Sequence, residues 1–123
     1  MSTRLIWVTF QRKGFHKYNE ASTSADLADV QYLGSRHRHL FKFKVSIEVR
    51  HDNRELEFHQ FLNYCESLFD QTIDIDHKSV EMLADDLYAQ INVKYPGRYV
   101  EIEVSEDGEC GCCISYDTNY HGG

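Results

Sequence analysis

Alternation of apolar and polar residues is clearest in the stretch from Leu40 to Val49. A period of two residues predicts a strand with one face on the core and the other toward solvent. His37-Arg38-His39 opens this strand, and His39 shares the parity of the apolar positions. The apolar positions are Phe41, Phe43, Val45, Ile47 and Val49.

Three other segments also have the pattern of strands. Arg4 to Phe10 carries apolar residues on both faces, so either both faces are covered or one of them packs on a partner. Tyr99 to Glu106 alternates valine and isoleucine with glutamate, and Gly111 to Tyr116 forms a last short strand after a turn at Gly108.

Two segments show helical spacing instead. The first is predicted from Glu57 to Phe69, and the second begins after Ser79, a suitable N-cap, and ends before the Pro96-Gly97 turn. Their apolar stripes are Phe58, Phe61, Leu62, Cys65 and Leu68, and Val80, Leu83, Ala84, Leu87 and Ile91.

Two segments lack a clear period. Gln11 to Tyr32 is interpreted as a long irregular connection with one helical turn at Ala25 to Val30, and it could carry His16 toward His37 and His39. Asp70 to Asp76 alternates isoleucine with acidic residues but is too short to classify.

The predicted order is therefore strand, strand, helix, helix, strand, strand. This order favours an α+β fold, with a four-stranded antiparallel sheet and both helices on one face. A length of 123 residues suits one domain, residues 1–123, with a substantial core.

Composition narrows the classes of partner and compartment. The chain has 20 Asp and Glu against 13 Lys and Arg, which argues against nucleic acid or an anionic membrane surface as the main partner. There is no signal peptide and no apolar run of membrane-spanning length, so a cytoplasmic protein is expected. The four cysteines are unevenly spaced, which favours a reducing compartment over a disulfide framework.

His37 and His39 form the first candidate metal site. Side chains two apart on a strand point the same way, so the two imidazoles can share one space at the mouth of the core. A divalent metal such as zinc needs at least a third protein ligand. Two surface histidines beginning a strand are the alternative interpretation.

Glu106 and the clustered cysteines have candidate roles as well. Glu106 continues the inward parity of its strand, so it either grips a ligand through N–H donors or reaches solvent from a frayed strand end. Cys110-Gly111-Cys112-Cys113 could form a second metal site with His121, but neighbouring strand positions point to opposite faces. Small buried side chains are the favoured interpretation of the three cysteines.

Several motifs together resemble the T-fold family of 6-pyruvoyltetrahydropterin synthase and 6-carboxytetrahydropterin synthase. His37-Arg38-His39 resembles the His-Gly-His of that family, and His16 loosely matches its first histidine. Glu57-Phe58 resembles the Asp-Phe that opens the family's first helix, and Ser79 to Ala84 resembles the Thr-x-Glu-x-Leu-Ala of its second helix. Glu106 matches the glutamate that anchors the pterin in that family. The final Gly111 to Tyr116 also resembles the family's ending, so the resemblance spans nearly the whole chain.

The resemblance implies a site and an assembly. It implies zinc held by His16, His37 and His39, with Asp76 and His77 as the catalytic pair and Glu106 and Glu81 as ligand-binding residues. The implied substrate is similar to dihydroneopterin triphosphate, a pterin related to purine nucleotides. The implied assembly is a homo-oligomer, a hexamer of two trimers or another ring, with the pocket at the subunit boundary.

Departures from the family leave two functions open. Leu33 occupies the position of the family's catalytic cysteine, and leucine can be neither acid, base nor nucleophile. The loop between Asp76-His77 and the second helix is missing, and Arg38 replaces a glycine, either at the rim of the site or simply in solvent. The chain is thus a zinc-dependent pterin synthase or a non-catalytic protein that binds a nucleotide or pterin, or serves assembly, on the same fold.

Overall fold

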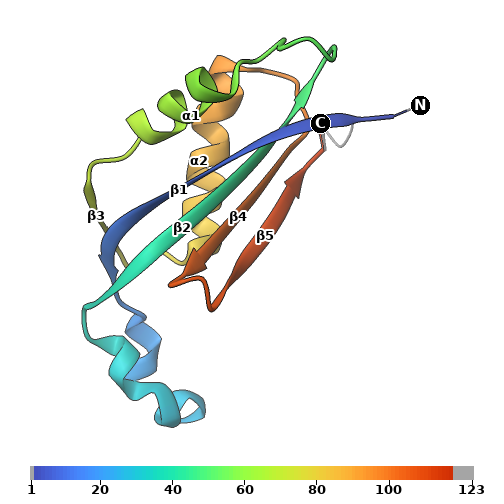
Figure 1. Cartoon of the computed structure of the whole chain (residues 1–123). Coiled ribbons are helices and arrows are strands. Elements are labelled where there is room, and N and C mark those ends of the chain that lie inside the picture. The colour runs from blue at the N-terminus through green and yellow to red at the C-terminus, as the bar shows by residue number, and fades with distance from the viewer. Residues whose placement is uncertain (1, 118–123) are drawn as a thin grey trace.

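A five-stranded mixed sheet forms the centre of the chain in the computed structural model, which describes residues 2–117 (Figure 1). The strand order is β3-β1-β2-β4-β5. β3 is parallel to β1, and the other neighbours are antiparallel. The strands are β1 (Arg4–His16), β2 (His37–Val49), β3 (Thr72–Asp76), β4 (Val100–Glu106) and β5 (Cys110–Tyr116).

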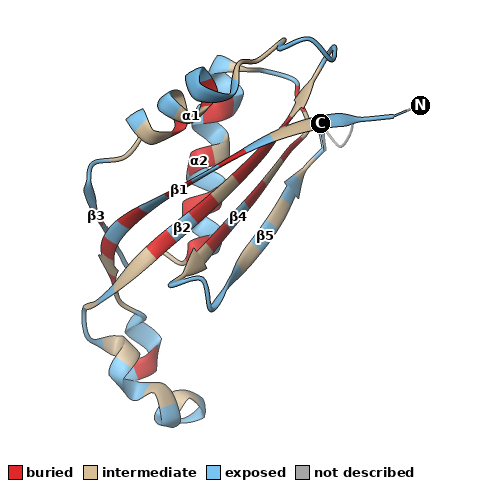
Figure 2. Ribbon diagram, viewed as in Figure 1, coloured by how far each residue is buried: buried red, intermediate tan, exposed pale blue. Residues whose placement is uncertain are grey.

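Two α-helices cover one face of the sheet, as the apolar stripes predict. α1 (Phe58–Ser67) packs against β1, and α2 (Val80–Lys94) packs against β4 and β5. The buried residues lie along the strands and on the helix faces that meet them (Figure 2). Their fully buried large members are Phe41, Phe43, Val45, Ile47, Phe61, Cys65, Leu87, Ile91, Val100, Ile102 and Val104.

The α+β prediction is confirmed, but the predicted four-stranded antiparallel sheet is wrong. Thr72–Asp76 adds a fifth strand, β3, which runs parallel to the end of β1. The sequence does not identify this strand, because the segment is only five residues long and buries only Ile73 fully. A strand with so little buried surface carries a weak alternation signal.

β1 is also longer than predicted, because it continues through the polar residues to His16. Arg12, Gly14 and His16 keep the inward parity of the strand, but none of them is an apolar residue. The Arg12 guanidinium donates to the Glu66 carboxylate at 3.3 Å, the Glu66 carbonyl at 3.1 Å and the Gln11 carbonyl at 2.9 Å, and a Cβ on Gly14 would come within 2.7 Å of Phe41 and Ile73. His16 therefore lies at a strand end and not in an irregular connection.

The connection between β1 and β2 contains two short 3-10 helices, η1 (Asn19–Ser22) and η2 (Ala25–Gly34). They extend beyond the end of the sheet, below the strands in Figure 1. Only one turn was predicted here, and no fully buried residue lies within η2.

Capping side chains set the starts of both α-helices. The Ser79 hydroxyl accepts a hydrogen bond from the Met82 backbone N–H at 3.2 Å, which confirms the predicted N-cap. The Glu57 carboxylate accepts from the His59 N–H at 2.8 Å, so Glu57 caps α1 and the helix begins at Phe58.

The prediction of buried cysteines on the last strand is wrong for two of them. Cys110 and Cys113 are exposed, and Cys112 is half-buried. β5 is an edge strand, and only its even-numbered positions from Cys112 onward face the helices. His121, the partner of these cysteines in the less favoured metal-site interpretation, lies outside the described residues.

No helix in the described part of the chain is long and apolar enough to cross a membrane.

A buried ion pair closes the end of the sheet opposite His16. The Arg98 guanidinium donates to both Glu55 carboxylate oxygens, at 2.6 and 2.8 Å, and to the Glu48 carbonyl at 3.0 Å. The Arg50 backbone N–H also donates to Glu55. These bonds, first of all those from Arg98, lower the pKa of Glu55 from 4.5 to about 2.

We expect Glu55→Gln to lower the free energy of unfolding by about 1–3 kcal/mol near neutral pH, because a charged hydrogen-bond acceptor is lost. The folded-state pKa of Glu55 lies below its unfolded value, so this stabilisation is full above pH 4.5 and is lost as pH falls toward about 2. Urea titrations of both proteins across this range measure the effect. Glu20→Gln, at an exposed site, is the control, and equal pH profiles for wild type and Glu55→Gln would contradict the assignment.

Candidate metal centre

Three histidines meet on the core face of the sheet, where β1 ends and β2 begins. His16 pairs directly with His37 across the two strands, and His39 lies two residues further along β2. One ring nitrogen of each lies within 4.8 Å of the others. The structure thus brings together the three residues that the sequence analysis selected as metal ligands.

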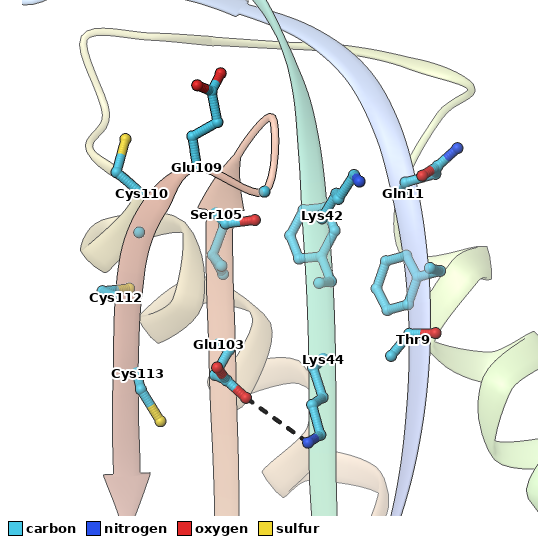
Figure 3. A pocket seen from close by; sticks show the side chains of 15 residues that line it. Thr9, Gln11, Lys42, Lys44, Glu103, Ser105, Glu109, Cys110, Cys112 and Cys113 are labelled. Atoms are coloured by element: carbon cyan, nitrogen blue, oxygen red, sulfur yellow. Dashed lines mark ion pairs between the residues drawn. The ribbon is translucent and has the colours of Figure 1, made fainter.

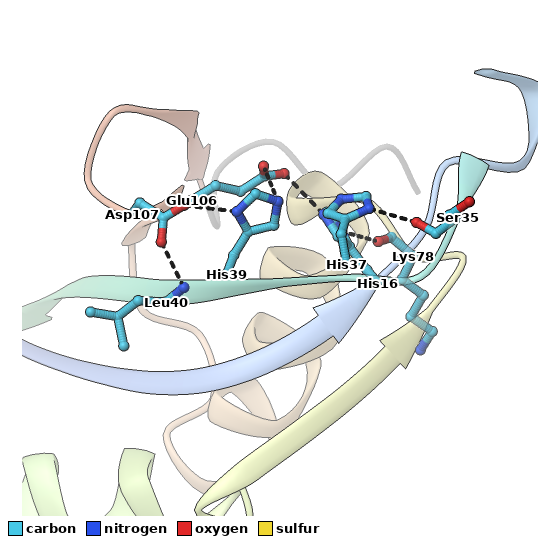
Figure 4. Close-up of polar contacts among 8 residues, drawn as sticks. All are labelled: His16, Ser35, His37, His39, Leu40, Lys78, Glu106 and Asp107. Atoms are coloured by element: carbon cyan, nitrogen blue, oxygen red, sulfur yellow. Dashed lines mark hydrogen bonds and ion pairs between the residues drawn. The ribbon is translucent and has the colours of Figure 1, made fainter. Parts of the chain in front are cut away.

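An oxygen atom lies near the Nδ1 of each ring (Figure 4). The partner is the Ser35 carbonyl at 2.8 Å for His37, the Asp107 carboxylate at 2.7 Å for His39, and the Lys78 carbonyl at 3.4 Å for His16. An oxygen acceptor favours the tautomer with its proton on Nδ1. Each Nε2 is then a lone-pair donor, the form in which imidazole binds a metal.

The Glu106 carboxylate lies against two of these nitrogens. Its oxygens are 3.4 Å from His16 Nε2 and 3.1 Å from His39 Nε2. His39 Nε2 is buried and has no hydrogen-bond partner. A cation placed between a nitrogen lone pair and a carboxylate oxygen stabilises both groups. Imidazole nitrogens together with a carboxylate form a ligand set that suits zinc and similar divalent ions.

The histidine environment favours neutral imidazole at His16. Burial lowers the pKa of His16, and this effect outweighs the opposing attraction of Glu106. Neutral imidazole is the form that binds metals. The Leu40 N–H and then His39 lower the pKa of Asp107, so this carboxylate stays ionised beside His39.

A cavity of about 450 Å³ opens beside the histidines. Its walls come from β1, β2, η2, β4, the turn before α2 and the start of α2. Among the residues that line it are His16, His37, Leu33, His77, Glu81 and Glu106. The structure therefore gathers in one cavity most of the residues that the resemblance selected.

Asp76 and His77 lie at the border of this cavity. Both side chains are exposed, and His77 Nδ1 is 3.4 Å from an Asp76 carboxylate oxygen. His77 lines the cavity, whereas Asp76 lies outside its lining and is 3.7 Å from the Lys17 ammonium. Only the histidine of this predicted pair is placed to meet a bound ligand.

Asp107 is the site residue that sequence analysis missed. It follows Glu106 in the turn between β4 and β5, where its φ of 60° is in the left-handed region. The Asp107-Gly108 pair is a turn signal, but the signal does not show that the carboxylate returns to His39.

A larger groove of about 780 Å³ lies on the opposite face of the sheet (Figure 3). Lysine, glutamate and cysteine side chains line it, and Lys44 is 3.9 Å from Glu103. None of the three clustered histidines reaches this groove, so its greater size does not make it the metal centre.

A search with models of protein families and a search of curated proteins both returned no match for this chain.

We expect His16→Ala, His37→Ala and His39→Ala each to lose zinc binding, because two imidazoles hold the ion far more weakly than three. Circular dichroism should change little, since the histidines lie at strand ends. Zinc content after dialysis, measured by atomic emission, gives the result.

His51→Ala and His59→Ala are matched controls at exposed positions and should keep full zinc content. Serine at Cys110, Cys112 and Cys113 together should also leave zinc content unchanged. Full zinc retention in both the His37 and His39 variants would rule out this centre.

Proposed function

We propose that the chain is a zinc-binding protein of the pterin-synthase type that holds a pterin or purine-type ligand beside the metal. One observation carries the proposal. Three imidazoles, each with its Nδ1 next to an oxygen acceptor, converge at one point, and two of them, His16 and His37, line a 450 Å³ cavity. A cavity of this size suits a bicyclic ring with a short side chain.

The donor set fits zinc. His16, His37 and His39 are the residues that hold the ion, and the buried His39 Nε2, which makes no hydrogen bond although a Glu106 oxygen lies 3.1 Å away, marks the place for a cation. Three histidines leave a further position open, as in catalytic zinc sites. Bound zinc supplies a Lewis acid that polarises an oxygen of the ligand.

The other residues of the cavity have complementary roles. Glu106 accepts N–H groups from the edge of a pterin or guanine ring, and Glu81 offers a second carboxylate from the first turn of α2. His77 is exposed at the cavity and exchanges protons with ligand and solvent, helped by Asp76. Lys17 and Lys78 also line the cavity and suit a phosphorylated side chain.

For the enzyme candidate, the reaction is of the 6-carboxytetrahydropterin synthase type, on a substrate similar to dihydroneopterin triphosphate. A second candidate is binding without turnover, which would sequester a pterin or nucleotide. The observation that favours it is Leu33, which lines the cavity at the position of the family's catalytic cysteine, while no described cysteine does so.

The same resemblance extends the proposal to a T-fold and a homo-oligomeric ring. Trp7 is 58% exposed on the face of the sheet away from the helices. Within residues 2–117, no strand pairs with the outer side of β5. An exposed aromatic side chain and a free strand edge are both better satisfied against a second copy.

We expect Glu106→Gln to weaken binding of neopterin and of GTP to the zinc-loaded protein by at least about tenfold, because one acceptor becomes a donor that faces a donor. Isothermal titration calorimetry measures both affinities, and the zinc content of each sample is measured first. Glu109→Gln is the control, since Glu109 is exposed and lines the opposite groove. Unchanged affinity in zinc-loaded Glu106→Gln would place the ring elsewhere.

We expect little or no turnover of dihydroneopterin triphosphate by the natural protein, and a gain in turnover for Leu33→Cys. The new thiol would lie in the wall of the cavity and supply the missing acid-base group. Product formation followed by chromatography gives the rate. Robust wild-type turnover would instead assign the proton transfer to another group, with His77 the first to test.

A further inference from the structure

The Asp107 carboxylate is held in one orientation by two hydrogen bonds. Its Oδ1 accepts from the Leu40 backbone N–H at 2.8 Å, and its Oδ2 lies 2.7 Å from His39 Nδ1. The Asp107 backbone N–H in turn donates to the Leu40 carbonyl at 2.7 Å. The carboxylate is therefore fixed to the start of β2, next to His39.

This contact determines what His39 presents to the other histidines. An ionised carboxylate only accepts hydrogen bonds, so His39 Nδ1 must carry the proton. In the neutral ring Nε2 then carries the lone pair; this atom is buried 3.1 Å from a Glu106 oxygen, in a geometry that makes no hydrogen bond. A carboxylate on the far nitrogen of a ligating histidine fixes the ring and raises the basicity of the ligand.

His39 differs from the other two histidines in the kind of group that lies next to its Nδ1. His16 and His37 have backbone carbonyls next to Nδ1, those of Lys78 and Ser35. Only His39 among the three depends on a side chain for its tautomer. One substitution can thus reverse the tautomer of one ligand and leave the backbone intact.

We propose that Asp107 is a positioning residue that fixes the Nδ1–H tautomer of His39 and aims its Nε2 at the metal. The inference rests on the proposed function for the identity of the metal, but the tautomer can be measured without any metal. Loss of the carboxylate is expected to cost about 10–100-fold in zinc affinity.

Two substitutions separate this role from a purely structural one. The left-handed backbone of Asp107 accepts both asparagine and glycine. Asparagine keeps an oxygen for the Leu40 N–H but turns its amide N–H₂ toward His39, which favours the wrong tautomer. Glycine removes both side-chain bonds and leaves His39 free to choose its tautomer.

The experiment measures two properties of wild type, Asp107→Asn and Asp107→Gly. Nitrogen-15 NMR of the metal-free proteins in mildly alkaline solution reports the tautomer of His39, and competition with a chelator reports zinc affinity. We expect Nδ1–H in wild type and Nε2–H in Asp107→Asn. We expect zinc affinity to fall in the order wild type, glycine variant, asparagine variant.

The ranking of the two variants by zinc affinity distinguishes a tautomer-setting role of Asp107 from a purely structural one. If Asp107 only supports the turn, the asparagine variant keeps wild-type affinity and the glycine variant is the weaker one, and this result overturns the proposal. An Nε2–H tautomer in metal-free wild type also overturns it. A wild-type protein that shows the Nδ1–H tautomer but binds no zinc would support the role of Asp107 in setting the tautomer and reject the proposed function.

Discussion

The pairing register of β1 with β2 is the constraint on which the rest of the structure depends. The two strands pair over 13 residues each, from Arg4 opposite Val49 to His16 opposite His37. A slip of one residue would turn one strand's side chains to the other face and separate the histidines. Gly14, opposite His39, adds a steric limit, because any Cβ there would clash with Phe41 and Ile73. The register that buries the core is thus the register that assembles the metal centre.

The centre is arranged to receive positive charge. The Nε2 atoms of His16 and His39 lie against the oxygens of Glu106, and with both rings neutral these nearest atoms are all acceptors that face one another. Such an arrangement is unfavourable in a buried place unless a proton or a cation is shared. The oxygen acceptors next to the three Nδ1 atoms leave Nε2 as the metal-binding nitrogen of each neutral ring, so that a divalent cation can satisfy the facing lone pairs.

Much of the fold could be predicted, because the apolar pattern of β2, α1 and α2 is strong and the Ser79 cap is a local feature. The end of β1 could not be predicted, because the buried Arg12 and Gly14 interrupt the apolar pattern. Their burial depends on residues distant in the sequence, Glu66 for Arg12 and Phe41 and Ile73 for Gly14. His37 and His39 could be grouped by strand parity alone. The role of Asp107 could not be predicted, because it depends on a turn with positive φ that brings together residues 67 positions apart.

The most direct test of the metal centre is X-ray absorption at the zinc edge on the zinc-loaded wild-type protein. The account predicts three imidazole nitrogens at about 2.0–2.1 Å, with the remaining coordination from oxygen. A sulfur shell at about 2.3 Å would place the metal at the cysteines of β5 instead. Fewer than three imidazoles would equally contradict the assignment of His16, His37 and His39 as the ligands.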